Sequence, residues 1–168
     1  SSGIAVGMAT NVPPHNLGEI VDGLIALIRD KDISDSKLSK FILGPDFPTG
    51  GELIYNDSIR EFYQTGRGSL TIRGVIKSEE VNLGKGKHKK NALIISELPY
   101  QISKAGWIEK LAELVNIGKI DGISDIRDES DREGMRILIE LKKDSNPEIV
   151  ISNLYKKTAL QSNFGAIF

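Results

Sequence analysis

The stretch after Asn16 carries apolar side chains at the spacing of one face of a helix. These apolar positions are Ile20, Leu24, Leu27 and Ile28. A period of three to four residues is that of an α-helix with one buried side. Asn16 is a favourable N-cap residue, and Glu19 three positions later fits a capping-box pattern. The pattern therefore predicts an amphipathic helix over residues 16–30.

Two shorter helices are predicted before the period changes. One covers residues 36–41, and the other begins with the pair Ser58 and Glu61 and ends at the TGRG sequence, residues 65–68. Between them the sequence GPDFPTGG, residues 44–51, holds two prolines and three glycines. Such a cluster marks a structured loop.

Beyond the TGRG sequence the apolar period becomes two, which is typical of half-buried strands. LTIRGVI, residues 70–76, alternates apolar with polar side chains, and NALIISEL, residues 91–98, is a more apolar strand. Because a Gly/Lys turn at 82–90 separates these strands, they are predicted to form a long hairpin. Further strands are predicted at 122–128 and 134–143.

Two amphipathic helices accompany these strands. One is predicted over 103–118, where Gly118 is the stop signal. The other is predicted over 146–158, with Asn146 as N-cap and Pro147 in the first turn. Helices that flank a mixed or antiparallel sheet with a long hairpin place the chain in the α+β class.

The opening of the chain shows neither period. SSGIAVGMATNVPPHN is rich in small residues, carries single apolar side chains at Ile4, Val6 and Met8, and ends in a loop that holds two prolines. Since this stretch has no apolar face to bury, residues 1–15 are predicted to form a loop.

Composition narrows the classes of function. The chain has 168 residues, a net charge of −1 and no cysteine, so disulfide, thiolate and cysteine–zinc chemistry are excluded. Because the chain is not basic overall, binding to nucleic acid must rest on local patches. No apolar run approaches the roughly 20 residues of a membrane helix, and no secretory signal is visible. The chain does not begin with Met, and we interpret it as a piece of a longer protein.

Common motifs for nucleotide binding and for nucleophilic catalysis are missing from the sequence. GKGKHKK does not have the spacing of a P-loop, TGRGSLT lacks the third glycine of a dinucleotide fingerprint, and no Gly-x-Ser-x-Gly sequence occurs. The chain holds two histidines, His15 and His88, so a histidine metal site or a catalytic triad has few residues to use.

Four features each have a structural and a functional interpretation. The acidic stretch DIRDESDRE, residues 125–133, is either a salt-bridged turn between strands or a site for Mg²⁺. His15 either packs on the start of the predicted helix or contacts a phosphate. The lysines of the 82–90 turn, and Arg67 between two glycines, are either solvated side chains or contacts for a nucleic acid.

Several longer motifs together resemble one family. The opening stretch is followed by PDFPTGG, TGRG, ELPYQISKA, GISDIRDESDREGMR and SNLYKKTALQSNF. This series resembles the A subunit of bacterial-type DNA gyrase, which is a type IIA topoisomerase, in the same order and over essentially all 168 residues. PTGG and TALQS resemble gyrases of the cyanobacterial or plastid kind, and topoisomerase IV shares most of the motifs.

The resemblance implies a part in an enzyme that breaks one DNA duplex, passes a second duplex through and reseals the break, with ATP-dependent negative supercoiling as the result. The family's nucleophile is a tyrosine preceded by arginine. None of the tyrosines here follows an arginine: they are Tyr55, Tyr63, Tyr100 and Tyr155. The resemblance therefore implies a single α+β tower-type domain over 1–168 that begins just after the catalytic winged-helix domain. Such a fragment has no catalytic residue and is expected to be inactive alone.

The resemblance also implies which residues contact DNA. Residues 1–15 become a DNA-facing loop that leads in from the winged-helix domain. In family members the isoleucine at the position of Ile4 inserts between base pairs and kinks the duplex. The other expected DNA contacts are Ser2, Thr10, Asn11, Arg67 and Lys104, with Lys87 and Lys89 of the lysine turn as further candidates.

The implied partners are double-stranded DNA and the other chains of an A2B2 heterotetramer, which holds two A subunits and two B subunits; no membrane is expected. Mg²⁺ and ATP are expected on the B subunit. No metal or cofactor is expected on this chain. Two alternatives are a topoisomerase IV A-type subunit that decatenates DNA and a stand-alone, non-enzymatic DNA-binding module. The expected location is a bacterial cytoplasm, with a plastid-type organelle as the alternative.

Overall fold

A computed structural model describes residues 2–48, 50–82 and 89–168 of the chain. Its helices and strands are, in chain order, β1 (Ser2–Ala5), β2 (Met8–Asn11), α1 (Leu17–Arg29), α2 (Asp35–Leu38), β3 (Glu52–Leu53), α3 (Asp57–Thr65), β4 (Arg67–Arg73), β5 (Val75–Asn82), β6 (Lys89–Glu97), α4 (Lys104–Asn116), β7 (Ile123–Asp128), β8 (Ile137–Leu141), α5 (Pro147–Lys157) and β9 (Gln161–Ile167). Two open sheets have the strand orders β1-β2-β9-β4-β3 and β5-β6-β8-β7, with helices beside them. The predicted α+β class is confirmed.

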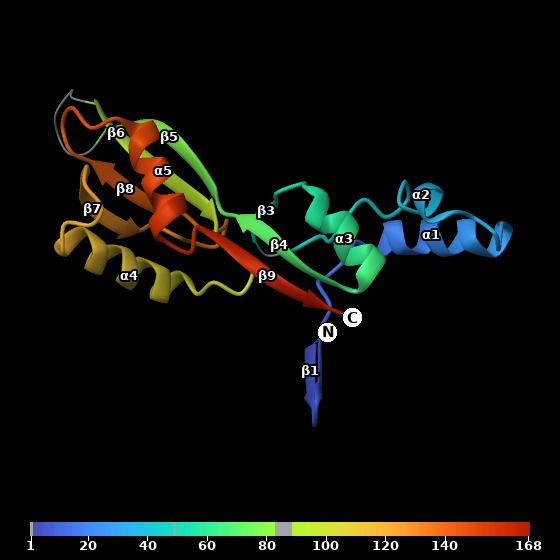
Figure 1. Ribbon diagram of the computed structural model, residues 1–168. Coiled ribbons are helices and arrows are strands. Elements are labelled where there is room, and N and C mark those ends of the chain that lie inside the picture. Colours follow the sequence, from blue (N-terminus) through green and yellow to red (C-terminus); the bar gives the residue numbers. More distant parts are fainter. Residues whose placement is uncertain (1, 49, 83–88) are drawn as a thin grey trace. The chain divides into compact units, whose positions relative to one another are not determined.

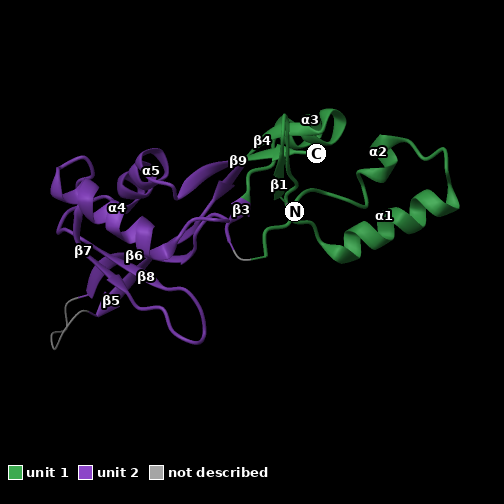
Figure 2. Cartoon of the chain, turned by 90° about the horizontal axis from the view of Figure 1, so that it is seen from below, with its two compact units in different colours: residues 1–48, 53–70, 164–168 green, residues 49–52, 71–163 purple. Residues whose placement is uncertain are grey.

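The chain folds into two compact units, which Figure 2 shows in different colours. Unit 1 comprises residues 1–48, 53–70 and 164–168, and unit 2 comprises 49–52 and 71–163. Both β4 and β9 contribute residues to the two units. The single tower-type domain over 1–168 stays a prediction.

Unit 2 has a well-filled hydrophobic core between its sheet and two helices. Helices α4 and α5 cover one face of the β5-β6-β8-β7 sheet (Figure 1). The alternation predicted for β8 directs Ile137 and Ile139 into this core, where they meet Leu111 of α4 and Leu154 of α5. Trp107 is buried in the same core, and its Nε1 donates to Thr158 Oγ1 at 3.2 Å. This core holds unit 2 together.

The predicted long hairpin is confirmed in unit 2, but its first strand is wrong: residues 70–76 divide at Gly74 between β4 and β5, which belong to different sheets, and β5 is the strand that pairs with β6. Strands β5 and β6 pair antiparallel, with Val75 opposite Glu97 at one end of the ladder and Asn82 opposite Lys89 at the other. The tip of the hairpin, including Lys87 and most of the predicted lysine turn, lies outside the described residues.

The predicted N-caps Asn16 and Asn146 are confirmed, whereas the helix predicted over 36–41 is observed as the shorter α2, Asp35–Leu38. Asn16 caps α1, because its Oδ1 accepts hydrogen bonds from the backbone N–H groups of Gly18 and Glu19 at 2.9 and 3.3 Å. The carboxylate of Glu19 accepts instead from Leu43 N at 3.3 Å. For α3 the predicted start at Ser58 is wrong: Asn56 is the N-cap, because its Oδ1 accepts from the N–H of Ser58 at 3.1 Å.

The segment expected to be a loop over residues 1–15 is in part a β-hairpin. Strands β1 and β2 pair antiparallel from Ser2 opposite Asn11 to Ala5 opposite Met8, and Val6-Gly7 form the turn. Gly7 has a φ of +76°, in the left-handed region that only glycine adopts freely. The alternating pattern of a strand is missing because both faces of this hairpin are exposed.

Within the described ranges, no helix combines the length and the apolar character that a bilayer span requires.

We expect the core of unit 2 to respond sharply to truncation. Leu111→Ala removes buried methyl groups and leaves a cavity, so the free energy of unfolding falls by about 2–5 kcal/mol. Urea unfolding followed by the fluorescence of Trp107, the single tryptophan, measures the change. The control Ile149→Ala alters a side chain that is 61% exposed and shifts stability by less than about 0.5 kcal/mol. Equal effects of the two variants contradict this description of the core.

Candidate nucleic-acid interface

The β1–β2 hairpin of unit 1 presents an apolar side chain to solvent. Ile4 is 93% exposed. Its cross-strand neighbour is Ala9, and the adjacent pair on the same face is Ser2 and Asn11. A branched apolar group whose paired neighbours on this face are small or polar is free to enter a narrow space in a binding partner. Figure 1 shows strand β1 extending away from helices α1 and α3 of unit 1.

The exposed face of the hairpin continues onto β9 and β4. Asn11 lies opposite Ile167 of β9. Phe168 N donates to Gly66 O at 2.8 Å, and this register brings Arg67 of β4 opposite Ile167. Asn11, Ile167 and Arg67 therefore lie in one row across the sheet, on the face that also carries Ile4.

The opposite face of this part of the sheet packs against α3. The rings of Phe168 and Phe62 stack with centroids 4.7 Å apart, and Leu70 and Ala166 are buried. Because strand residues alternate between faces, the burial of Leu70 and Ala166 against Phe62 directs Arg67 away from α3 and toward solvent. Its charge is not neutralised there, since Arg67 has no ion pair with any residue that the structure describes.

The two glycines beside Arg67 have roles in the fold. Gly66 ends α3 with a φ of +73°, as a left-handed C-cap. At Gly68 an added Cβ would lie 2.9 Å from the Cβ of Phe62, so only glycine lets β4 approach α3 this closely. These glycines therefore position Arg67 through packing inside unit 1.

Polar side chains of β2 fasten the hairpin to β9. Asn11 Nδ2 donates to Gly165 O at 2.7 Å, and Thr10 Oγ1 donates to Ile167 O at 3.3 Å. Thr10 lies on the hairpin face opposite to Ile4, whereas Ser2 and Asn11 share the Ile4 face. The structure thus brings Ser2, Ile4, Asn11 and Arg67 together on one face of unit 1 and places Thr10 behind it.

This chain matches, over residues 1–168, the protein family described as the A subunit of DNA gyrase/topoisomerase IV. It belongs to that family. It is 60% identical over 166 residues to the DNA gyrase A subunit of Synechocystis sp., covering 99% of this chain and 19% of the relative. It is 59% identical over 168 residues to the DNA topoisomerase 4 A subunit of the same organism, covering 99% of this chain and 18% of the relative.

A third relative is an organelle protein by name. The chain is 54% identical over 164 residues to the chloroplastic/mitochondrial DNA gyrase A subunit of Arabidopsis thaliana, which covers 98% of this chain and 17% of the relative. The chain therefore spans less than a fifth of the length of these curated relatives. The chain is thus about equally similar to the gyrase protein and to the topoisomerase IV protein of Synechocystis sp..

Two of the lysines expected to contact DNA, Lys104 and Lys89, belong to unit 2 and lie beside carboxylates. Lys104, the first residue of α4, has its Nζ 2.9 Å from Asp128 Oδ2, and the Nζ of Lys89 lies 3.7 Å from Glu80 Oε2. These pairs are exposed, so each contributes little to stability and can be exchanged for another anion. Their DNA contacts, like those of Ser2, Ile4, Thr10, Asn11 and Arg67, stay predictions.

The acidic stretch 125–133 forms a salt-bridged turn between β7 and β8. Arg127 pairs with Asp125 at 3.3 Å and with Glu140 at 3.4 Å. Arg136 pairs with Glu129 at 3.4 Å. The ion pairs that the structural interpretation expects are therefore present. In the part of the chain that the structure describes, no three His, Asp or Glu side chains are arranged to hold a metal ion.

His15 packs on a tyrosine that the sequence did not point to. Its Nε2 lies 2.7 Å from Tyr63 Oη, and its Nδ1 lies 2.8 Å from Pro13 O. Burial, with a smaller effect of the Glu19 charge, raises the pKa of Tyr63 to about 12, so its hydroxyl stays protonated. Because Pro13 O can only accept, the ring hydrogen is on Nδ1, and in this tautomer Nε2 accepts from the Tyr63 hydroxyl. The Nδ1–H then donates to Pro13, and this pairing assigns His15 a structural role at the start of α1.

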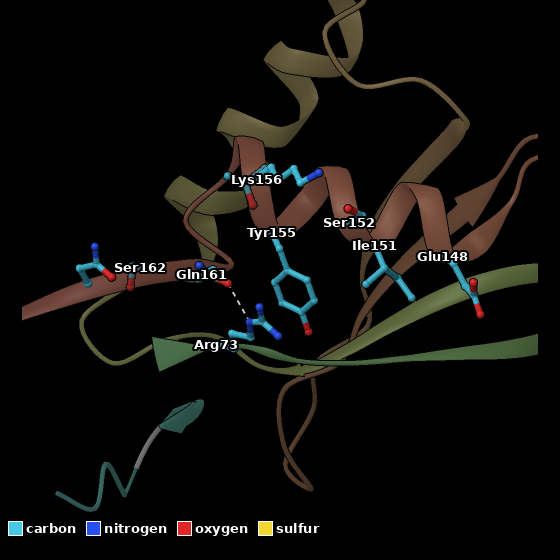
Figure 3. A pocket seen from close by; sticks show the side chains of 10 residues that line it. Arg73, Glu148, Ile151, Ser152, Tyr155, Lys156, Gln161 and Ser162 are labelled. Carbon is cyan, nitrogen blue, oxygen red and sulfur yellow. Dashed lines mark hydrogen bonds between the residues drawn. The ribbon is translucent and has the colours of Figure 1, made fainter. Parts of the chain in front are cut away.

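A polar depression of about 690 Å³ in unit 2 is another feature that no sequence motif indicates (Figure 3). Arg73 Nε donates to Gln161 Oε1 at 2.7 Å, and its guanidinium lies 4.9 Å from the centroid of the Tyr155 ring. Lys156 and Glu148 also line the depression. Its residues come from β4, α5 and β9, so only the fold brings them together, and their mixed charge selects no class of ligand.

We expect the ion pair of Lys104 to be visible in the titration of Asp128. Hydrogen bonds from Ser130 and then from Lys104 lower the pKa of Asp128 to about 2. Lys104→Met should therefore raise this pKa part of the way toward the ordinary value of about 3.9. The charged carboxylate of Asp128 stabilises the folded state fully at pH values above the ordinary pKa, and this stabilisation disappears as the pH falls toward 2.

Carboxyl-carbon NMR of Asp128 measures this pKa. The control Lys110→Met removes the exposed pair with Glu113 and leaves the titration of Asp128 unchanged. An identical Asp128 titration in the wild type and in Lys104→Met shows that the pair does not act on this carboxyl group.

Proposed function

We propose that this chain is the part of a gyrase-type A subunit that binds and bends the duplex that the full enzyme cleaves. The observation that carries the proposal is the exposed Ile4, which shares one sheet face with Ser2, Asn11 and Arg67. Membership of the gyrase/topoisomerase IV family supports it, because the names of the relatives connect the family with DNA.

Ile4 acts as the wedge. An apolar side chain pushed between two base pairs partly unstacks them, at a cost of a few kcal/mol, and kinks the duplex. A bent duplex contacts more of the protein, and these extra contacts offset the cost of unstacking. The tight Val6-Gly7 turn and the small residues Gly3 and Ala5 let the hairpin backbone approach a groove closely.

Arg67 and the polar side chains hold the phosphates. Arg67 neutralises a phosphate, while the hydroxyl of Ser2 and the amide of Asn11 lie where they can bond the DNA backbone directly or through water. These contacts carry no sequence information, so the deformability of the DNA sets site preference. With a net charge of −1, the chain by itself binds DNA weakly and loses affinity as salt rises.

The cleavage chemistry belongs to other parts of the enzyme. The tyrosines of this chain follow Ile54, Phe62, Pro99 and Leu154, so none matches an Arg-Tyr pair. The proposal assigns Mg²⁺ and ATP to the B subunit of an A2B2 heterotetramer, in a bacterial cytoplasm or a plastid-type organelle. We expect the isolated chain to have no topoisomerase activity.

The second candidate is the A-type subunit of topoisomerase IV, which decatenates DNA. It is favoured by the 59% identity to the DNA topoisomerase 4 protein of Synechocystis sp., against 60% for the gyrase protein of that organism. Supercoiling and decatenation assays of the complete enzyme distinguish the two.

Ile4→Ala in the complete enzyme should reduce DNA bending far more than DNA binding. The shorter side chain cannot hold a base step open, while the phosphate contacts remain. We expect the bent state in a FRET assay to be largely lost and supercoiling to fall with it, with affinity changed by no more than about threefold, under 1 kcal/mol.

The matched control for the wedge is Met8→Ala. Met8 is 75% exposed on the same hairpin, but its side chain lies on the face opposite to Ile4. This variant should bend DNA as the wild type does. Unchanged bending in Ile4→Ala, or equal losses in both variants, would falsify the wedge.

Arg67→Gln should lower the salt dependence of DNA binding. Removing one phosphate contact makes the slope of log K against log salt concentration less steep by about 0.9. The control Arg60→Gln removes an exposed charge from α3, on the other side of β4, and should leave the slope unchanged. Fluorescence anisotropy at four or more salt concentrations gives both slopes, and equal slopes for the wild type and Arg67→Gln exclude the contact.

A further inference from the structure

The two units differ in how many of their large apolar side chains are exposed. Unit 2 buries its large hydrophobic residues around α4 and α5. Of the exposed large hydrophobic residues in the described chain, all except Ile117 and Ile149 belong to unit 1. Outside the hairpin, most of them are on helix α1. Unit 1 therefore carries an apolar surface that its own residues do not cover.

One stripe of α1 accounts for the largest part of this surface. It consists of Leu17, Val21, Leu24 and Ile28, which we call the α1 stripe. Their exposed fractions lie between 43% and 76%. The intervals of four, three and four residues put all of them on one side of the helix, over about 17 Å at 1.5 Å per residue.

Another side of α1 makes the contacts within unit 1. Gly23 is the one buried residue of α1, and a Cβ added there would lie 3.0 Å from the Cδ1 of Ile42. Helix α2 lies against α1 on this side, as Figures 1 and 2 show. The α1 stripe is therefore a separate face, and the packing of α1 on its own unit leaves it uncovered.

A helix such as α1 needs other residues to pack on its apolar face. An isolated helix of about 13 residues is marginal in water, and helices in proteins are stabilised mainly by packing of an apolar face. In α1 that face is exposed to solvent. The free energy that holds α1 in place must then come in part from residues that pack on the stripe.

We propose that a helix from another part of the same polypeptide, outside these 168 residues, packs along the α1 stripe. The relatives of this chain carry more than four fifths of their length outside the matched region, which supplies such a segment. Alternating intervals of three and four residues are typical of two packed helices, in which side chains of one helix fit into the spaces between side chains of the other. The inference does not depend on DNA binding.

The size of the stripe favours a tethered partner over a separate one. A coiled coil between two copies sustains its pattern over three or four heptads, whereas the α1 stripe covers fewer than two. A stable interface between separate proteins also takes about 800 Å² from each partner, which is more than three turns of one helix face offer. A segment of the same polypeptide loses much less freedom on docking, so a small apolar face holds it.

Photo-crosslinking in the full-length protein tests the partner. Leu24 is replaced by the photoreactive p-benzoylphenylalanine, and the matched control carries it at Asp22, an exposed position off the stripe. We expect a crosslink at position 24 within a single polypeptide, to a segment that mass spectrometry maps outside residues 1–168, and none of this kind at position 22. A crosslink inside residues 1–168, a crosslink between two polypeptides, or no product overturns the proposal.

Hydrogen exchange of the unmodified protein gives a second test that does not depend on a variant folding. The backbone amides of α1 should exchange at least about tenfold more slowly in the full-length protein than in the 168-residue chain, a difference of about 1.4 kcal/mol. Leu24→Gln in the full-length protein should remove most of this protection, and Asp22→Gln should leave it. Equal exchange in the full-length protein and the 168-residue chain, or equal exchange in both variants, overturns the proposal.

Discussion

The attachment of β2 to β9 is the interaction on which the candidate interface depends. A two-stranded hairpin is marginally stable by itself, and this one has no apolar face buried against unit 1. Two side-chain bonds, from Asn11 to Gly165 and from Thr10 to Ile167, join it to a strand whose own other face packs on Phe62. Hydrogen bonds rather than hydrophobic contacts attach the hairpin to unit 1. The hairpin can therefore present Ile4 to solvent without needing this side chain for its own attachment.

The two units bury their apolar residues in different ways. In unit 2, helices α4 and α5 cover the sheet, and the resulting core is self-contained. In unit 1, a small aromatic cluster that includes Phe62 and Phe168 packs beneath β4 and β9, while Ile4 and α1 remain exposed. For the same physical property, an uncovered apolar surface, we propose two different uses: a wedge for stacked bases at Ile4 and a docking face for protein at α1. The surroundings separate them, since Ile4 stands among small and polar residues and the α1 stripe continues over three turns.

Much of the fold follows from local patterns. The period of two in β8, the caps at Asn16 and Asn146, and the hairpin of β5 and β6 were all predictable, because each arises from neighbours in the sequence. The β1–β2 hairpin was not, since its strands have no buried face and thus no alternation. The Ser58–Glu61 pair predicts a start of α3 two residues too late. The side chain of Asn56 caps the helix instead, because it accepts a hydrogen bond from the N–H of Ser58. For the site, the resemblance of the motifs pointed to Ile4 and Arg67, but residue chemistry alone favoured a loop residue and a solvated arginine.

The sequence by itself determined the α+β class, the family and most helix and strand positions, because periodicity, capping and long motifs are properties of contiguous residues. Only the tertiary structure decided that Arg67 and Asn11 flank Ile167 on the face of Ile4, that Tyr63 bonds His15, and that the acidic stretch pairs with Arg127 and Arg136. It also decided that the apolar side of α1 is uncovered. Apart from the ion pairs of the acidic stretch, these relations join residues far apart in the chain, and their geometry depends on strand register and helix packing, which local patterns do not contain.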